Sequence, residues 1–101
     1  MENLDVFKEL ITATISPFNA QIIKAVFNYD IKYDLYQCKL YLSDARFFII
    51  EMHHRSFRDY RDTNDSKSKM DFLGESQKNI KRYLENEQFH TPLRITFGTI
   101  N

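Results

Sequence analysis

Three consecutive runs of apolar residues with a period of two occupy residues 22–53, and they constrain the fold more than any other feature of this chain. In the first run Ala25, Phe27, Tyr29, Ile31 and Tyr33 alternate with mostly polar residues, and residues 36–42 repeat the pattern. A period of two places successive side chains on opposite faces of a strand. Tyr33-Asp34 and the sequence SDA at residues 43–45 separate the runs and suit turns. The pattern predicts a meander of three antiparallel strands.

The third run, RFFIIEMH, carries apolar residues on both of its expected faces. Phe48, Ile50 and Met52 fall on one face, whereas Phe47 and Ile49 fall on the other. A strand that is covered on both sides is usually central in a sheet or lies at a subunit contact. The sequence leaves these two alternatives open.

Helical periodicity flanks the meander on both sides. An amphipathic helix is expected over about residues 4–15, and Ser16-Pro17 ends it or starts a second short turn. A second helix is expected after the N-cap candidates at residues 63–66, and Pro92 ends that segment. Its apolar stripe comprises Met70, Leu73, Ile80 and Leu84. The alternating sequence LRITF then predicts a last, short strand.

Two residues of the second helix depart from its pattern. Gln77 is the one polar member of the stripe. Gly74 costs a helix about 1 kcal/mol relative to alanine. This glycine indicates either close packing against the sheet or no special role.

The predicted fold is α+β, in a single domain over residues 1–101. Its order is α-β-β-β-α-β, with an antiparallel sheet of three to four strands and two helices packed on one face. Two helices on one face leave the other face of the sheet uncovered. The residues expected on that open face are Lys24, Asn28, Asp30, Lys32, Gln37, Lys39, Tyr41, Phe47, Ile49, Glu51, His53, Arg94 and Thr96.

Composition excludes several classes of function. Lys plus Arg and Asp plus Glu number 14 each, so no long-range field attracts a polyanion to the whole molecule. The longest uncharged apolar run, residues 47–50, is too short to span a membrane. The single cysteine cannot form an intrachain disulfide, and the two glycines leave few positions for a phosphate-binding loop. We therefore expect a soluble, cytoplasmic protein without a cofactor or a membrane partner.

The sequence EMHHRSFRDYRD, residues 51–62, invites a metal hypothesis. Adjacent residues of a strand point to opposite faces, so His53 and His54 cannot hold one ion together. Glu51 and His53 share a face, and His90 could supply a third ligand. Zinc sites use recognisable His and Cys spacings that this set lacks. Ordinary, half-exposed histidines are the preferred interpretation, and no metal is predicted.

The arginines of the same stretch are balanced by acidic neighbours. Arg55, Arg58 and Arg61 are accompanied by Asp59, Asp62 and Glu51, so the segment has no net charge. Exposed pairs of this kind contribute a few tenths of a kcal/mol each. The segment is therefore interpreted as a solvated connection rather than a phosphate clamp.

Catalytic constellations find little support. Cys38 shares its alternating face with Leu40 and Leu42, which is typical of an inert, buried thiol. Asp30 and Glu51 could face each other across neighbouring strands, but an open sheet offers no cleft for acid–base chemistry. We expect that the protein is not an enzyme.

The leading functional hypothesis is stoichiometric protein binding. Aromatic and aliphatic side chains among charged residues are typical of interfaces. The expected contact residues are Tyr41, Phe47 and Ile49 on the open face, together with His53, Arg55, Arg58 and Arg61. A phage-type or immunity-type inhibitor of a larger enzyme is one version, based on small size and a composition rich in Ile, Lys, Asn, Phe and Tyr. A homodimer through the open sheet face is a further expectation.

The alternative hypothesis is a small nucleic-acid-binding domain. On the same face Lys24, Lys32, Lys39 and Arg94 would contact phosphates, while aromatic rings stack on bases. Asp30 and Glu51 lie on that surface and count against this alternative. The sequence therefore ranks it second.

Overall fold

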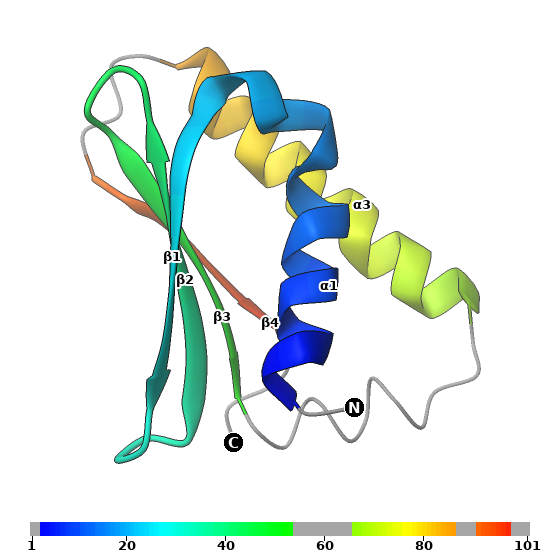
Figure 1. The fold of residues 1–101 in the computed structure, drawn as a ribbon. Coiled ribbons are helices and arrows are strands. Elements are labelled where there is room, and N and C mark those ends of the chain that lie inside the picture. Colours follow the sequence, from blue (N-terminus) through cyan, green and yellow to red (C-terminus); the bar gives the residue numbers. More distant parts are fainter. Residues whose placement is uncertain (1–2, 54–65, 87–90, 98–101) are drawn as a thin grey trace.

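The computed structural model describes residues 3–53, 66–86 and 91–97, and it confirms the predicted order of elements (Figure 1). The bounds are α1 (Asn3–Ile15), the 3₁₀ helix η1 (Ser16–Gln21), β1 (Ile22–Asp30), β2 (Leu35–Leu42), β3 (Phe47–His53), α3 (Ser66–Glu85) and β4 (Leu93–Phe97). The turn at Ser16-Pro17 is thus a short second helix, in which proline occupies one of the first two positions. That position suits proline because its missing N–H would have no intrahelical partner there.

The sheet is mixed rather than purely antiparallel. Its strand order is β1-β2-β3-β4, and the three strands of the meander pair antiparallel as predicted. β4, however, pairs parallel to β3, so the prediction of an antiparallel sheet is wrong for this strand. The helix between the two strands explains this direction. The 20 residues of α3 span about 30 Å and carry the chain back to the end of the sheet where β3 begins, so β4 starts there and runs the same way (Figure 1).

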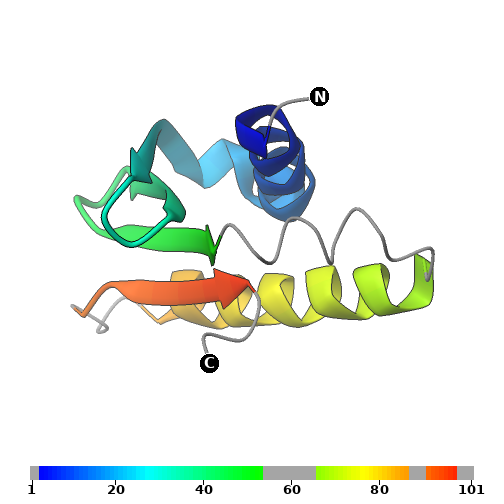
Figure 2. The ribbon, with the colours of Figure 1, turned by 90° about the horizontal axis from the view of Figure 1, so that it is seen from below.

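Both helices cover the same side of the sheet, as predicted (Figures 1 and 2). The core between them is built from side chains with exposed fractions of 1% or less, among them Phe7 and Ile11 of α1, Phe48 and Ile50 of β3, and Ile80 of α3. Alternate residues of a strand point to the same side of the sheet, so Phe48 and Ile50 lie on one face, as the alternating sequence predicted. Neither helix of the described ranges lies on the opposite side of the sheet.

The β1–β2 turn is shaped by the side chain of Asp30. Its Oδ1 accepts hydrogen bonds from the backbone amides of Lys32 (3.0 Å) and Tyr33 (3.4 Å). This interaction ends the strand at residue 30, and Asp34 completes the turn with a φ of 53°. The expectation that alternation continues to Tyr33 is therefore wrong, and Lys32 lies in the turn rather than in the sheet.

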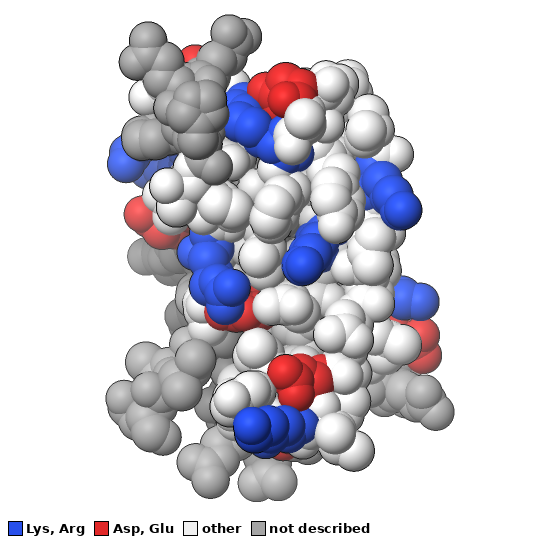
Figure 3. Space-filling view, turned by 90° about the vertical axis from the view of Figure 1, so that its left-hand side faces the viewer, with Lys and Arg blue, Asp and Glu red and all other residues white. Residues whose placement is uncertain are grey.

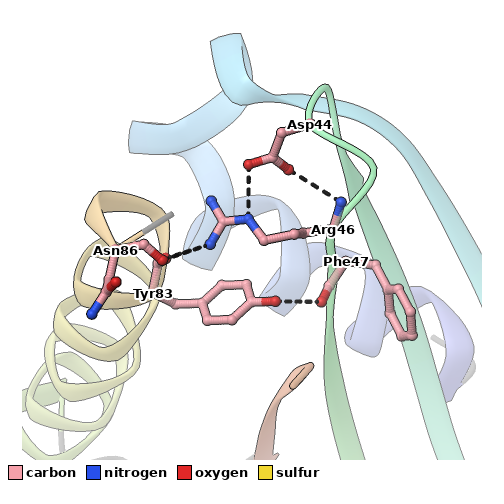
Figure 4. Close-up of polar contacts among 5 residues, drawn as sticks. All are labelled: Asp44, Arg46, Phe47, Tyr83 and Asn86. Carbon is pink, nitrogen blue, oxygen red and sulfur yellow. Dashed lines mark hydrogen bonds and ion pairs between the residues drawn. The ribbon is translucent and has the colours of Figure 1, made fainter. Parts of the chain in front are cut away.

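An arginine that the sequence did not single out joins the β2–β3 turn to the end of α3 (Figure 4). Arg46 Nη1 donates to the backbone carbonyls of Tyr83 (3.0 Å) and Asn86 (2.9 Å), and Nε donates to Asp44 (2.7 Å). The guanidinium also lies 4.9 Å from the ring centroid of Tyr83, whose hydroxyl donates to the Phe47 carbonyl at 3.1 Å. Carbonyls at a helix C-terminus lack intrahelical donors, so this cation caps α3.

The polar member of the α3 stripe has a similar role at the end of α1. Gln77 Nε2 donates to the carbonyls of Ala13 (3.4 Å) and Thr14 (3.3 Å). Gly74, by contrast, does not mark close packing, because a Cβ added there would meet nothing within 4 Å. No helix in the described part of the chain has the length and apolar character needed to cross a membrane.

Candidate functional site

The candidate site is the side of the sheet that the helices leave uncovered, called here the open face (Figure 3). The strand register arranges its residues in rows. One row contains Lys24, Tyr41 and Phe47; the next contains Val26, Lys39, Ile49 and Arg94; a third contains Asn28, Gln37, Glu51 and Thr96. These residues come from four strands, so the fold assembles a surface that no single segment contains.

An aromatic pair occupies the first row. The ring centroids of Tyr41 and Phe47 are 5.7 Å apart, with their planes inclined by 38°. Lys39 Nζ lies 5.8 Å from the Phe47 centroid, within the range of a cation–π contact. Both aromatic side chains are partly exposed. They are the residues of the predicted contact surface that present apolar rings to solvent.

Ile49, unlike these two aromatic residues, is buried. Only 6% of it is exposed, so the expectation of an outward-looking aliphatic contact is wrong for this residue. Its partners in register, Lys39 and Arg94, carry long aliphatic stems that can shield a neighbouring apolar group from water. β3 lies between β2 and β4, so it is a central strand, as the first of the two alternatives predicts.

Glu51 forms the polar centre of the open face. Its carboxylate accepts hydrogen bonds from Gln37 Nε2 (3.2 Å), Arg94 Nη1 (3.2 Å) and Thr96 Oγ1 (2.9 Å). The residue is 3% exposed, whereas the Arg94 side chain is 57% exposed. A buried carboxylate needs such partners, and these three fix the relative positions of β2, β3 and β4. The sequence placed Glu51 and Arg94 on one face, but the contact depends on strand pairing that the sequence does not reveal.

The acid–base pair considered from the sequence does not form. Asp30 is on β1 and Glu51 is on β3, and β2 lies between these strands, so the expectation that they face each other across neighbouring strands is wrong. Asp30 instead holds the β1–β2 turn. The buried thiol of Cys38 is on the helix-covered side with 0% exposure, and burial raises its pKa to about 12. A thiol in this state is a poor nucleophile.

The histidine and arginine stretch is only partly described. His53 is the last residue of β3, is partly exposed and falls on the same face as Glu51. Arg55, Arg58, Arg61 and His90 lie outside the described residues. Within residues 3–53, 66–86 and 91–97, no three metal-ligating side chains form a group that could hold an ion.

The basic residues of the nucleic-acid hypothesis are not all brought together. Lys24, Lys39 and Arg94 share the open face, whereas Lys32 is in the turn with its Nζ 5.3 Å from the Tyr33 ring. Arg94 is already bound to Glu51. Figure 3 shows cationic and anionic residues interspersed on this side of the molecule rather than a field of one sign.

Comparisons with known proteins add no assignment to this geometry. The chain gives no significant match to a family model, a curated protein or a solved structure. The functional argument therefore rests on the open face itself.

Proposed function

We propose that this chain is a non-enzymatic interaction protein that binds one protein partner stoichiometrically through the open face. The observation that carries the proposal is the partly exposed pair of Tyr41 and Phe47, whose ring centroids are 5.7 Å apart on the side of the sheet opposite α1 and α3. Aromatic side chains with polar neighbours account for much of the affinity of protein interfaces. Lys24 lies opposite Tyr41 in the strand register, and Lys39 lies beside Phe47, so the rim here is cationic.

The rigidity of the open face supports the same proposal. Binding loses affinity when flexible side chains must be ordered, and a preorganised surface avoids part of that cost. Glu51 holds Gln37, Arg94 and Thr96 by hydrogen bonds, and all three side chains belong to the open face. A suitable partner offers an apolar pocket for the two rings and acidic groups around it, because opposite charges at the rim accelerate association.

An inhibitor that docks on a larger enzyme, of the phage or immunity type, is the specific form of this proposal. It is supported by the small size of the chain and by a composition rich in Ile, Lys, Asn, Phe and Tyr. His53 extends the proposed surface at the end of β3, and Arg55, Arg58 and Arg61 follow it in the sequence.

Binding of single-stranded nucleic acid is the second candidate. Two lysines next to two aromatic rings on a sheet are favourable for base stacking with phosphate contacts. Such binding weakens steeply as salt rises because it depends on counterion release. A protein contact anchored by Tyr41 and Phe47 changes little over the same range. Salt dependence therefore separates the two candidates.

The test is affinity capture from lysates of the cells that encode the chain, with and without nuclease. The baits are the wild type, Phe47→Glu, and Tyr33→Glu as a matched control. Tyr33 is 61% exposed in the β1–β2 turn, so this control introduces the same charge at an exposed aromatic residue outside the open face.

The proposal predicts a protein that is retained in a fixed ratio by the wild type and by Tyr33→Glu, but not by Phe47→Glu. Nuclease and moderate salt leave this retention unchanged. Circular dichroism of each bait establishes that it is folded. If folded Phe47→Glu retains the same partner as the wild type, the open face is not the binding surface. Retention that nuclease abolishes favours the nucleic-acid candidate.

A further inference from the structure

The free edge of β1 is the second unusual surface of the molecule. β1 lies at the end of the strand order, so within the described residues only one of its two edges is paired. It is the strand nearest the viewer in Figure 1. The strand has nine residues without proline or glycine. Val26 (38% exposed) and Tyr29 (41%) expose apolar surface along its regularly paired part, and Ile23 (68%) does so at the register shift between Ile22 and Lys24. Long, apolar edge strands are templates for pairing with another chain.

The opposite edge lacks these properties. β4 has five residues, follows Pro92 and carries Arg94. Short length and a neighbouring proline are two ways in which sheets avoid edge pairing. The contrast singles out β1 as the edge that is able to accept a further strand.

The charges of β1 fit a second copy of the same strand. Lys24 precedes Phe27 by three residues, and Asp30 follows it by three. β1 pairs with β2 without a register shift from residue 24 to residue 30, so both charged residues lie on the open face. In an antiparallel pair centred on Phe27, Lys24 of each copy lies opposite Asp30 of the other. Registers centred on Lys24 or on Asp30 would instead place like charges opposite each other, which destabilises a strand pair.

We propose that this protein forms a homodimer in which two β1 strands pair antiparallel in the register centred on Phe27. The two-fold axis of such a pair is perpendicular to the sheet, so the helices of both copies lie on one side. The two sheets become continuous, and the two open faces join into one surface. This inference concerns the edge of the sheet and does not depend on the proposed function. The homodimer expected from the sequence, by contrast, would cover the open face.

Sedimentation velocity over a wide range of concentrations tests the proposal with the full chain. The variants are Lys24→Glu, Asp30→Lys and their equimolar mixture. Lys24 is exposed and makes no ion pair within the described residues, so its reversal leaves the monomer intact. Each variant alone brings like charges together in both symmetry-related pairs. We expect the dissociation constant of the dimer to rise about tenfold or more.

The mixture is the decisive sample. A Lys24→Glu chain and an Asp30→Lys chain have opposite charges at both pairs, so the mixture regains the dimer that neither variant forms alone. Each variant alone, at the same total concentration, is the control for the mixture. Lys78→Glu alone is the matched control for Lys24→Glu, because it has the same net charge but carries the substitution on α3 rather than on β1, and it keeps the wild-type dissociation constant.

Three results would overturn the proposal: a wild type that stays monomeric at every concentration, a dimer whose dissociation constant is the same in Lys24→Glu, or a mixture that associates no better than either variant alone. Asp30→Lys also removes the acceptor of the turn amides, so circular dichroism checks its fold. If this variant does not fold, the Lys24→Glu measurement alone decides. Loss of the dimer in Phe47→Glu, without an effect of Lys24→Glu, would assign the contact to the open face.

Discussion

Replacing Arg46 with alanine removes the cation that caps α3 and joins it to the β2–β3 turn. The wild-type guanidinium, in a side chain that is 10% exposed, donates to the carbonyls of Tyr83 and Asn86 at 3.0 and 2.9 Å. Hydrogen bonds from a charged donor contribute about 1.5–3 kcal/mol each. The Asn86 residue is exposed, so water replaces part of its lost bond.

The other two contacts of Arg46 add less. Asp44 is 44% exposed, and ion pairs at the surface are weak. The cation–π contact with Tyr83 contributes about 0.5–1 kcal/mol. Together with the discounted carbonyl bonds, we expect Arg46→Ala to lower the free energy of unfolding by about 2–4 kcal/mol. That loss is a large part of the roughly 5–15 kcal/mol typical of a domain.

Urea unfolding followed by circular dichroism measures this loss. Arg46→Lys is the first control, because it keeps the charge but not the guanidinium, whose Nη1 donates to both carbonyls while Nε donates to Asp44. An intermediate loss is expected. Asp44→Asn is the second control and removes only the exposed partner. If Arg46→Ala is no more destabilising than Asp44→Asn, the helix-capping role of the guanidinium is refuted.

Three further changes test separate parts of the structure. Gly74→Ala should stabilise the protein by about 1 kcal/mol and raise Tm by about 4–8 °C in a thermal melt, because the added methyl group meets no neighbour; an unchanged or lower Tm would contradict this. Glu51→Ala leaves the donors of Gln37 and Arg94 without their acceptor. It should lower the free energy of unfolding, measured in urea, by about 2–3 kcal/mol. A loss below about 0.5 kcal/mol would show that this hydrogen-bond network is unimportant for stability. Burial raises the pKa of the Cys38 thiol from 9.0 to about 12 in the folded state. Between pH 9 and pH 12 the unfolded chain therefore binds fewer protons than the folded chain. Stability should therefore fall by up to ~1.4 kcal/mol per pH unit above pH 9, and Cys38→Ala should lose that component of the slope; equal slopes in the two proteins would be the contrary result.

The sequence predicted the elements and their layers because those features depend on local periodicity. The alternation around Phe27, Leu40 and Phe48 is enough to define three strands and the face that each buries. The direction of β4 was not predictable in this way, since LRITF alternates equally well in either direction. It depends on the path of α3, which no pattern within the strand encodes.

The site was predictable only as a list of residues on one face. Tyr41 and Phe47 were assigned correctly to the uncovered side, because alternation fixes the face of each residue. The burial of Ile49 and the contact between Glu51 and Arg94 depend on which strands become neighbours. The Arg46 contact joins residues 40 positions apart in the chain. Local patterns carry no information on such contacts.

Hydroxyl-radical footprinting of the chain, alone and with its captured partner, tests the central claim most directly. The method reports the solvent exposure of aromatic side chains. We predict that the partner protects Tyr41 and Phe47 from oxidation and leaves Tyr33, in the β1–β2 turn, unchanged. If Tyr41 and Phe47 are oxidised equally in the free and bound states while residues on the helix-covered side become protected, the open face is not the interface.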